Sequence, residues 1–356
     1  MENLLDKPLT PWMAGGGPDG DIVLSSRIRL ARNLEGVPFP GRAGGEQLAE
    51  VAGELRKSVG DLAAADKHVY IFVEMDKLTP LERNILVEKH IVSPNLAGEP
   101  AQRALIVRDD AAVSIMVNEE DHLRLQCLVP GLNLPGALEM ANKVDDTLEN
   151  RHSFAYGEQV GYLTACPTNV GTGLRASLMM HLPALVLTGQ INRITAAATQ
   201  LGLAVRGLYG EGTEAIGNIF QVSNQLTLGH SEQEIIDNLQ SIGKQVVEQE
   251  RAARQTLAGG QLDALSDRVW RAFGILRYAR SISGQEALNL LSEVRLGIDL
   301  KIITGTEPQV FNELLVTTRP NFLQKIAGRA DIAPDERDRL RAQLIREKLK
   351  EAKNNA

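Results

Sequence analysis

Two arginines separated by a single residue, Arg27 and Arg29, are the first feature of this 356-residue sequence that suggests chemistry. If the segment is extended, both guanidinium groups point to one face, because side chains alternate along a strand. Neighbouring cations repel each other unless an anion lies between them, and phosphate oxygens accept paired hydrogen bonds from the planar guanidinium fork. The pair therefore indicates a phosphate site, with a solvated basic edge strand as the alternative interpretation.

Three consecutive acids, Glu119, Glu120 and Asp121, follow the apolar run 113–117. Acidic clusters of this kind usually mark a solvated turn or a metal site. Here apolar residues return at once, with Arg124 among them, which weakens the turn interpretation. We expect a strand end that opens onto a polar cleft.

Two loops that contain glycine come next. Loop 166–173 begins at Cys166, and we expect an apolar helix to start near Leu174, whose N-terminus would favour an anion. The sequence contains neither a P-loop pattern nor the motifs of the protein kinase fold, so any ATP chemistry must use another scaffold. Loop 206–214 has two glycines before Glu211 and predicts a mobile loop that brings a carboxylate over a site, with a structural hairpin as the alternative.

The elements that must position these residues fall into two regions. Up to about residue 228, β-like runs alternate with helix-like runs, and several are joined by short turns, which predicts a largely antiparallel sheet with helices packed on it. The pattern then becomes helical, beginning with a capping box at 231–234, and the Gly-Gly pair at 259–260 predicts a break. We expect an α+β fold with a catalytic domain at 22–254 and a helical C-terminal domain at 260–356. Strands are expected at 69–73, 105–107, 113–117, 122–127, 159–165, 204–208 and 219–222.

Composition limits the class of protein. Apolar residues make up 43% and charged residues 23%, which is typical of a globular protein. The net charge of −7 argues against direct nucleic-acid binding, and no run approaches the ~20 apolar residues of a membrane helix. The N-terminal region has no apolar run, so we expect no secretion signal. The two cysteines, Cys127 and Cys166, suggest no disulfide framework and favour the cytoplasm.

Together these segments resemble the phosphagen (guanidino) kinase superfamily, which includes creatine kinase and arginine kinase. The resemblance runs from about residue 23 to 229 and depends on the motifs Asn-Glu-Glu-Asp-His at 118–122 and Cys-Pro-Thr-Asn-x-Gly-Thr at 166–172. It implies that Glu120 and Glu211 grip the substrate guanidinium, that Cys166 is the reactive thiol beside it, and that Mg²⁺ is held by ATP rather than by a protein metal site. The implied ATP-binding residues are Ser25, Ser26, Arg27, Ile28, Arg29, His90, Arg124, Arg175, Ala176, Ser177, Leu178, Met179, Arg206, Gly207, Leu208, Tyr209, Gly210 and Glu211.

The physical chemistry agrees with these roles. A guanidinium is a very poor nucleophile, because its pKa lies above ~12 and its lone pair is delocalised. Two carboxylates can orient it by charge-assisted hydrogen bonds and remove a proton as the N–P bond forms. Several arginines with Mg²⁺ can neutralise the charge that spreads over the transferred phosphoryl group. A Cys166 thiolate suits so cationic a pocket, with a buried inert thiol as the alternative.

The sequence departs from the metabolic phosphagen kinases at both ends. Those proteins carry a helical domain before the paired arginines, so we expect that domain to be absent here and the acceptor side to be more open. Together with the C-terminal helical region, this resembles the bacterial protein arginine kinases. Their Arg-Asp-x-x-Arg-Ala motif occurs at 337–342 and implies an allosteric phosphoarginine site at Arg337, Asp338 and Arg341. On a helix, Arg337 and Arg341 share one face and could clamp a phosphate, with a solvated charged helix as the alternative.

The resulting hypothesis is an ATP-dependent kinase that phosphorylates arginine side chains of proteins, as a mark in the stress response and in protein degradation. The resemblance implies several partners: protein substrates (a heat-shock repressor and misfolded proteins), a zinc-binding activator protein, an AAA+ unfoldase–protease, and further copies of the chain in a homodimer or higher homo-oligomer. Two alternatives are a kinase of free arginine or another small guanidino compound, and a phosphoarginine-binding adaptor without catalysis.

Overall fold

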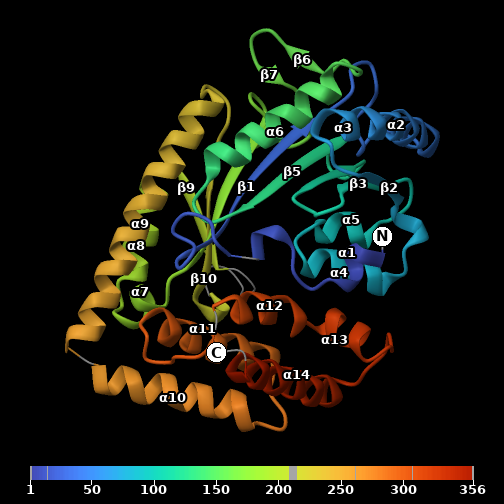
Figure 1. The fold of residues 1–356 in the computed structure, drawn as a ribbon. Coiled ribbons are helices and arrows are strands. Elements are labelled where there is room, and N and C mark those ends of the chain that lie inside the picture. Colours follow the sequence, from blue (N-terminus) through green and yellow to red (C-terminus); the bar gives the residue numbers. More distant parts are fainter. Residues whose placement is uncertain (1, 14, 208–214, 261, 307, 355–356) are drawn as a thin grey trace.

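The computed structural model of the chain describes residues 2–13, 15–207, 215–260, 262–306 and 308–354. Within these residues, eight strands form an antiparallel sheet in the spatial order β2-β3-β4-β5-β1-β8-β10-β9 (Figure 1). The fold is therefore the predicted α+β class with an antiparallel sheet. The strands are β1 (Val23–Arg32), β2 (Tyr70–Glu74), β3 (Ala104–Arg108), β4 (Val113–Val117), β5 (Leu123–Pro130), β8 (Leu174–His181), β9 (Leu203–Gly207) and β10 (Ile219–Asn224).

A short hairpin, β6 (Tyr156–Gly157) and β7 (Gly161–Tyr162), stands apart from the sheet at the top of Figure 1. It replaces most of the longer strand expected at 159–165. The helices that surround the sheet begin with α1 (Glu2–Asp6), α2 (Gly45–Lys57), α3 (Val59–Asp66), α4 (Pro80–Glu88), α5 (Pro94–Gly98), α6 (Leu134–Glu149), α7 (Pro183–Leu187), α8 (Ile191–Gln200) and α9 (Glu232–Gly260). The C-terminal helices are α10 (Leu262–Tyr278), α11 (Gly284–Asp299), α12 (Gln309–Thr317), α13 (Pro320–Ile326) and α14 (Pro334–Asn354).

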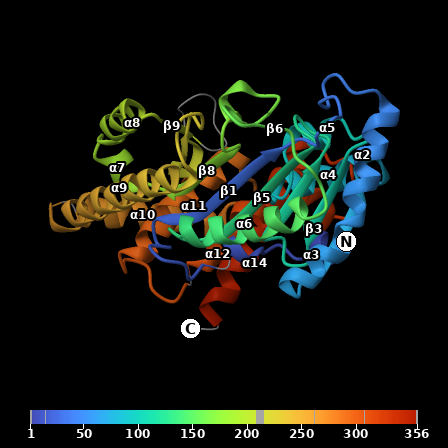
Figure 2. The ribbon, with the colours of Figure 1, turned by 90° about the horizontal axis from the view of Figure 1, so that it is seen from above.

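The two faces of the sheet have different coverings. Helices α6 and α9 lie in front of the strands in Figure 1, and Figure 2 shows both on the same side of the sheet. Gly243 of α9 approaches so closely that an added Cβ would lie 2.5 Å from the Leu178 side chain. On the opposite face, the side chain of Gln126 donates a hydrogen bond of 2.8 Å to the backbone oxygen of His90, just after α4. The same face also carries Arg29, Arg124 and Arg175, which line a cavity.

The segment after loop 166–173 is strand β8 and not the predicted helix. Leu, Ala and Met favour helices in isolation, but tertiary pairing overrides so weak a preference. Here β8 pairs with β1 on one side and with β10 on the other, and the result is an interior strand that is buried except at Arg175. The alternation of apolar Leu174, Ala176 and Leu178 with polar Arg175 and Ser177 is the strand signal in this segment.

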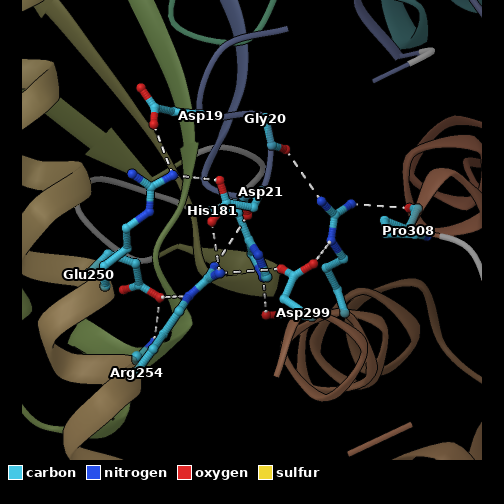
Figure 3. Close-up of polar contacts among 12 residues, drawn as sticks. Asp19, Gly20, Asp21, His181, Glu250, Arg254, Asp299 and Pro308 are labelled. Carbon is cyan, nitrogen blue, oxygen red and sulfur yellow. Dashed lines mark hydrogen bonds and ion pairs between the residues drawn. The ribbon is translucent and has the colours of Figure 1, made fainter. Parts of the chain in front are cut away.

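A buried polar network joins the C-terminal helices to the sheet (Figure 3). Glu250 of α9 accepts hydrogen bonds of 3.1 and 3.0 Å from the backbone N–H groups of Ala184 and Leu185, in the first turn of α7. Glu250 also accepts from Arg254 at 2.9 Å, and Arg254 lies 3.4 Å from the carboxylate of Asp299 on α11. Buried charges are tolerated when each has an opposite partner. The network therefore holds α9 and α11 in a defined position against the sheet end.

Candidate active site

Five arginines converge on one face of the sheet, because the register places them on neighbouring strands. Residues directly opposite each other in an antiparallel pair point to the same face. Arg29 lies opposite Arg175, and Arg27 lies opposite Ser177. Arg124 lies opposite Ala31, which is two residues after Arg29 and so faces the same side. Gln221 pairs with Met179 of β8 and with Arg206 of β9, which places Arg206 on this face as well. The converging set is Arg27, Arg29, Arg124, Arg175 and Arg206.

A cavity of about 520 Å³ lies on this face. Its lining includes four of the five arginines, all but Arg27, together with Glu120 and Cys166. A much smaller cavity of about 10 Å³ adjoins it, and Gln221 lines both. The smaller cavity is lined by the predicted nucleotide residues Ser25, Arg27, His90, Ser177 and Met179, with Leu128. The structure thus brings many of the predicted ATP-binding residues to two adjacent cavities on one face.

The paired arginines of β1 lie in a strongly cationic environment. The Arg27 guanidinium donates hydrogen bonds to Ser177 Oγ at 3.1 Å and to Gln221 Oε1 at 2.8 Å. Burial, followed by repulsion from Arg124, lowers the pKa of Arg27 to about 10. Burial lowers the pKa of Arg29 well below its usual value, and Arg27, Arg124 and Arg175 lower it further. Among the described residues, nothing accepts a hydrogen bond from the buried Nε of Arg29.

This arrangement fits an anion such as a triphosphate. A buried donor without an acceptor, surrounded by like charges, is costly for the folded chain. Phosphate oxygens bound between these guanidinium groups would supply both the acceptors and the opposite charge. The observation therefore supports the predicted phosphate site and disfavours a solvated basic edge strand, because β1 lies in the middle of the sheet.

His90 lines the smaller of the two adjacent cavities. Its backbone has a positive φ of 59°, and its ring makes an edge-to-face contact with Trp12 at a centroid distance of 5.5 Å. Burial, followed by repulsion from Arg27, lowers the pKa of His90 to about 3. The imidazole is therefore neutral at physiological pH, and a neutral aromatic ring suits contact with a nucleobase.

Two further arginines are held by residues near them in space. Arg175 donates to Asn169 Oδ1 at 2.9 Å, to Thr168 Oγ1 at 2.6 Å and to the backbone oxygen of Asn224 at 2.6 Å. Arg124 donates to both carboxylate oxygens of Glu119, at 2.8 and 2.7 Å. Glu119 is buried and also accepts from a serine hydroxyl at 2.6 Å. These contacts fix the direction of two guanidinium groups before any ligand binds.

In the acidic motif at 118–122, Glu120 and Asp121 both line the cavity, but only Glu120 is exposed. Asn118 has a positive φ of 58°, His122 is fully buried, and Asp121 accepts a hydrogen bond of 2.7 Å from the backbone N–H of Ala165, just before Cys166. Glu120 alone is exposed, and it lines the cavity. Burial, followed by repulsion from Asp121, raises the pKa of Glu120. The motif is thus a scaffold that presents one carboxylate.

Cys166 also faces the cavity, with its Sγ 3.1 Å from Thr168 Oγ1. It is half-buried and not the inert buried thiol of the alternative interpretation; that description fits Cys127, which is fully buried and whose pKa burial raises to about 12. Arg206 and Gly207 end strand β9 beside the cavity. The next predicted residues lie outside the described part of the chain: Leu208, Tyr209, Gly210 and Glu211.

Four of the predicted ATP-binding residues have side chains on the opposite face. Ser26 donates to the backbone oxygen of Gly131 at 2.7 Å, and Ile28, Ala176 and Leu178 belong to the hydrophobic core. Strand alternation is the reason, since these residues stand between the ones that face the cavity. Their side chains hold β1 and β8 in place and do not line the site.

The C-terminal motif has a different geometry from the predicted open clamp. Arg341 is buried, and its guanidinium donates to the backbone oxygens of Thr318 at 2.9 Å and Ile282 at 2.8 Å, and also to Asp338. Arg337 is half-buried on the same helix, α14. Nε and Nη1 of Arg341 thus face acceptors within the protein, and a joint role of Arg337 and Arg341 in binding a phosphate stays a prediction.

Several cavity residues have no recognisable signal in the sequence. Gln221, Ser223 and Gln225 come from β10 and the residue after it, and all three line the cavity. Only the pairing of β10 with β8 and β9 shows that Gln221 lies beside Arg27. Asn169, by contrast, lies inside the recognised motif at 166–172, and its position in that motif was a usable signal.

Two negative findings apply to the described residues. They include no group of three or more His, Cys, Asp or Glu side chains arranged to hold a metal ion. In the same part of the chain, no helix is both long and apolar enough to cross a membrane.

Comparison with known proteins first defines the class. The family described as ATP:guanido phosphotransferase, C-terminal catalytic domain, matches residues 50–253. The crystal structure of lombricine kinase resembles the fold with a TM-score of 0.58 and 27% sequence identity, over 69% of this chain and 70% of that one. Sheet, cavity and family match thus agree on a guanidino phosphotransferase.

Full-length relatives then narrow the assignment. The family described as Protein-arginine kinase McsB C-terminal domain matches residues 239–356. The protein-arginine kinase of Brevibacillus brevis is 52% identical over 98% of this chain and 98% of the relative, and that of Bacillus subtilis is 50% identical over 98% and 96%. The chain belongs to the protein-arginine kinases of the ATP:guanido phosphotransferase family.

Proposed function

We propose that this chain transfers the γ-phosphoryl group of ATP to arginine side chains of proteins. The observation that carries the proposal is the cluster of like-charged guanidinium groups around one cavity, where Glu120 is the exposed carboxylate among the described lining residues. The cations suit the triphosphate, and the carboxylate suits the cationic acceptor. The names of the full-length relatives support protein arginine as that acceptor.

In the proposed mechanism, Arg29, Arg124, Arg175 and Arg206 hold the phosphates, and Arg27 lies between them and the base site at His90. Mg²⁺, carried by the ATP phosphates, would neutralise part of their charge. Glu120, with Glu211 as the second carboxylate, orients the acceptor guanidinium. Fixing the nucleophile and the phosphorus in line contributes up to ~7–11 kcal/mol in favourable cases.

Phosphoryl transfer to the acceptor forms one bond, breaks one bond and releases one proton. A bond forms between an acceptor nitrogen and Pγ, the bond from Pγ to the bridging oxygen of ADP breaks, and one guanidinium proton passes to a carboxylate. The raised pKa of Glu120 makes its carboxylate a better proton acceptor than an ordinary glutamate. Cys166 lies at the same cavity, where we propose that its sulfur contacts the acceptor guanidinium.

The test uses Mg-ATP with an arginine-containing protein and, separately, with free arginine. Acid-labile, base-stable phosphate on the protein is the expected product. Preference for free arginine would favour the small-molecule alternative, and nucleotide binding without turnover would favour the adaptor. The variant Glu120→Gln should lose transfer, whereas Glu139→Gln, an exposed acid on α6, should retain it.

We further propose a role for the C-terminal motif as a phosphoarginine site. Arg337 would face the phosphate and Asp338 the guanidinium, while Arg341 holds Asp338 from within the protein. Binding of phosphoarginine, measured by calorimetry, should weaken in Arg337→Ala and persist in Arg339→Ala, an exposed neighbour. Equal binding in both variants would contradict this assignment.

The remaining assignments are proposals that rest on family membership. They are the division into domains at 22–254 and 260–356, a cytoplasmic location, and self-association into a homodimer or larger oligomer. The proposed partners are a heat-shock repressor and misfolded proteins as substrates, a zinc-binding activator protein and an AAA+ unfoldase–protease. Co-purification with each candidate from cells, followed by size-exclusion chromatography of the pure chain, tests them.

A further inference from the structure

Exposed apolar side chains gather next to the cavity. Of the twelve large apolar residues that are exposed in the described part of the chain, five belong to two short segments, 156–163 and 226–228, each between 36% and 61% exposed. The first segment contains the β6–β7 hairpin at the top of Figure 1. We call these five side chains the apolar rim: Tyr156, Val160, Leu163, Leu226 and Leu228.

The rim is connected directly to the loop that carries Cys166. Tyr162 and Gly171 exchange backbone hydrogen bonds of 2.8 and 3.3 Å, which ties the hairpin to the loop. The hydroxyl of Thr227 donates to the backbone oxygens of Thr168 at 3.2 Å and Val170 at 2.6 Å, which ties the second segment to the same loop. Cys166, Thr168 and Asn169 of this loop, and Gln225 just before the second segment, line the cavity.

Close backbone contacts hold the segments of the apolar rim in a defined position. Gly161 and Gly171 have φ values of 78° and 112°, and a Cβ on Gly161 would lie 2.4 Å from the backbone oxygen of Gly171. The Tyr162 ring lies over the guanidinium of Arg32 at 3.5 Å, and Arg32 forms a buried ion pair with Asp145 of α6. A Cβ on Gly157 would contact both the Val160 and Leu163 side chains, so these two rim residues lie together.

We propose that the apolar rim binds apolar side chains that flank the acceptor arginine in an unfolded segment of a protein substrate. The inference rests on the proposed function, because it assumes that an arginine enters the cavity from a polypeptide. A polypeptide that approaches the cavity from the side of Cys166, Thr168 and Asn169 passes over this loop and the segments bonded to it. In an extended segment each residue advances by ~3.3–3.6 Å, so residues two and four positions from the arginine lie roughly 7 and 14 Å from it.

The chemistry of the rim selects unfolded segments over folded surfaces. Large apolar side chains are mostly buried in a folded protein and become available when a segment unfolds. An arginine with leucine or valine nearby would therefore gain affinity at the rim, whereas an arginine on a polar folded surface would not. The cavity then binds the arginine, and the apolar rim binds the apolar side chains near it in the sequence.

The test compares two peptides that each contain one arginine. In one, leucine or valine occupies positions two and four on both sides of the arginine, and in the other, serine does. The wild-type chain should have a roughly ten-fold higher kcat/KM for the apolar peptide, through a lower KM, a size expected for partial burial of one or two leucines. The double variant Leu226→Ser, Leu228→Ser should lose this preference and keep its turnover of the serine peptide.

The control is Ile326→Ser, which changes an apolar residue 53% exposed on α13, among the C-terminal helices. It should keep the full preference. Val160→Ser on the hairpin provides a second, independent test if the double variant does not fold. Equal kcat/KM for the two peptides with wild-type protein, or an unchanged preference in both rim variants, would overturn the proposal.

Other occupants give different results. If the rim variants shift the chain from an oligomer to a smaller species in analytical ultracentrifugation and leave the peptide preference unchanged, the rim is a contact between copies and the proposal fails. Failure of the proposed function is distinguishable, because then neither peptide acquires phosphate.

Discussion

Replacement of Arg29 by methionine should make the nucleotide-free protein more stable while it weakens ATP binding. Arg29 has a buried Nε without an acceptor among the described residues, and three other arginines lower its pKa. Methionine is similar in length, carries no charge and needs no acceptor. The variant therefore removes an unfavourable arrangement, and stabilising single substitutions of this kind contribute about 0.5–2 kcal/mol.

The opposite effect is expected in the presence of ATP. A ligand present at 100 times its Kd stabilises a protein by ~2.7 kcal/mol. Loss of one charge-assisted hydrogen bond costs ~1.5–3 kcal/mol, which raises Kd by roughly 10- to 100-fold. At the same ATP concentration the Arg29→Met variant would then gain only ~0.4–1.4 kcal/mol. The stability advantage of Arg29→Met over the wild type without ATP should therefore shrink or reverse when ATP is present.

Chemical denaturation with and without Mg-ATP measures both effects. Arg56→Met is the matched control, because Arg56 is an exposed arginine with a single ion pair of 3.6 Å. Its stability should change by no more than ~0.5 kcal/mol, and ATP should stabilise it as it does the wild type. A nucleotide-free Arg29→Met protein that is clearly less stable than the wild type, or one that ATP stabilises fully, would refute the reasoning.

Three further predictions concern the site and its support. Glu120→Gln should lower kcat by ~10²–10⁴ with little change in ATP binding. Because the pKa of Glu120 is raised, wild-type activity should fall on acidification at a higher pH than it would with an ordinary glutamate. The pH–rate profile of the variant should lack this acidic fall. Arg341→Ala should cost ~2–4 kcal/mol in urea denaturation because it leaves two buried carbonyl oxygens without a donor, whereas exposed Arg339→Ala should cost less than ~0.5 kcal/mol. Gly161→Ala should displace the Cys166 loop through a clash with the backbone oxygen of Gly171, and should lower the transfer rate more than the ATP affinity that calorimetry measures.

Much of the fold could be predicted because its elements have clear local patterns. The alternation in β1 places Arg27 and Arg29 on one face, and the capping box at Ser231 and Glu234 is present, with a hydrogen bond of 3.2 Å from the Glu234 N–H to Ser231 Oγ. Strand β8 was predicted wrongly as a helix, because Leu, Ala and Met dominated the local preference. Its strand state depends on two partners distant in sequence, β1 and β10.

The site divides in the same way. The motifs at 118–122 and 166–172 identify the phosphotransferase chemistry, since each brings several unusual residues together in one short segment. They do not show which residues of a motif face the cavity and which hold the surrounding structure in place. Glu119 and Glu120 are neighbours of the same type, yet Glu119 is buried against Arg124 and Glu120 faces the cavity.

The sequence alone determined the type of chemistry, because charge, residue type and short-range alternation are properties of the chain itself. It determined the fold class, and it placed the two arginines of β1 on one side of a strand. Only the tertiary structure decided that five arginines from four different strands share one face, that Arg341 points into the protein, and that an apolar rim stands beside the cavity. These features depend on which strands become neighbours and on which donors find buried acceptors. Both are set by packing between residues distant in the sequence, such as Arg27 and Ser177, which are 150 residues apart, and Arg341 and Ile282, which are 59 residues apart.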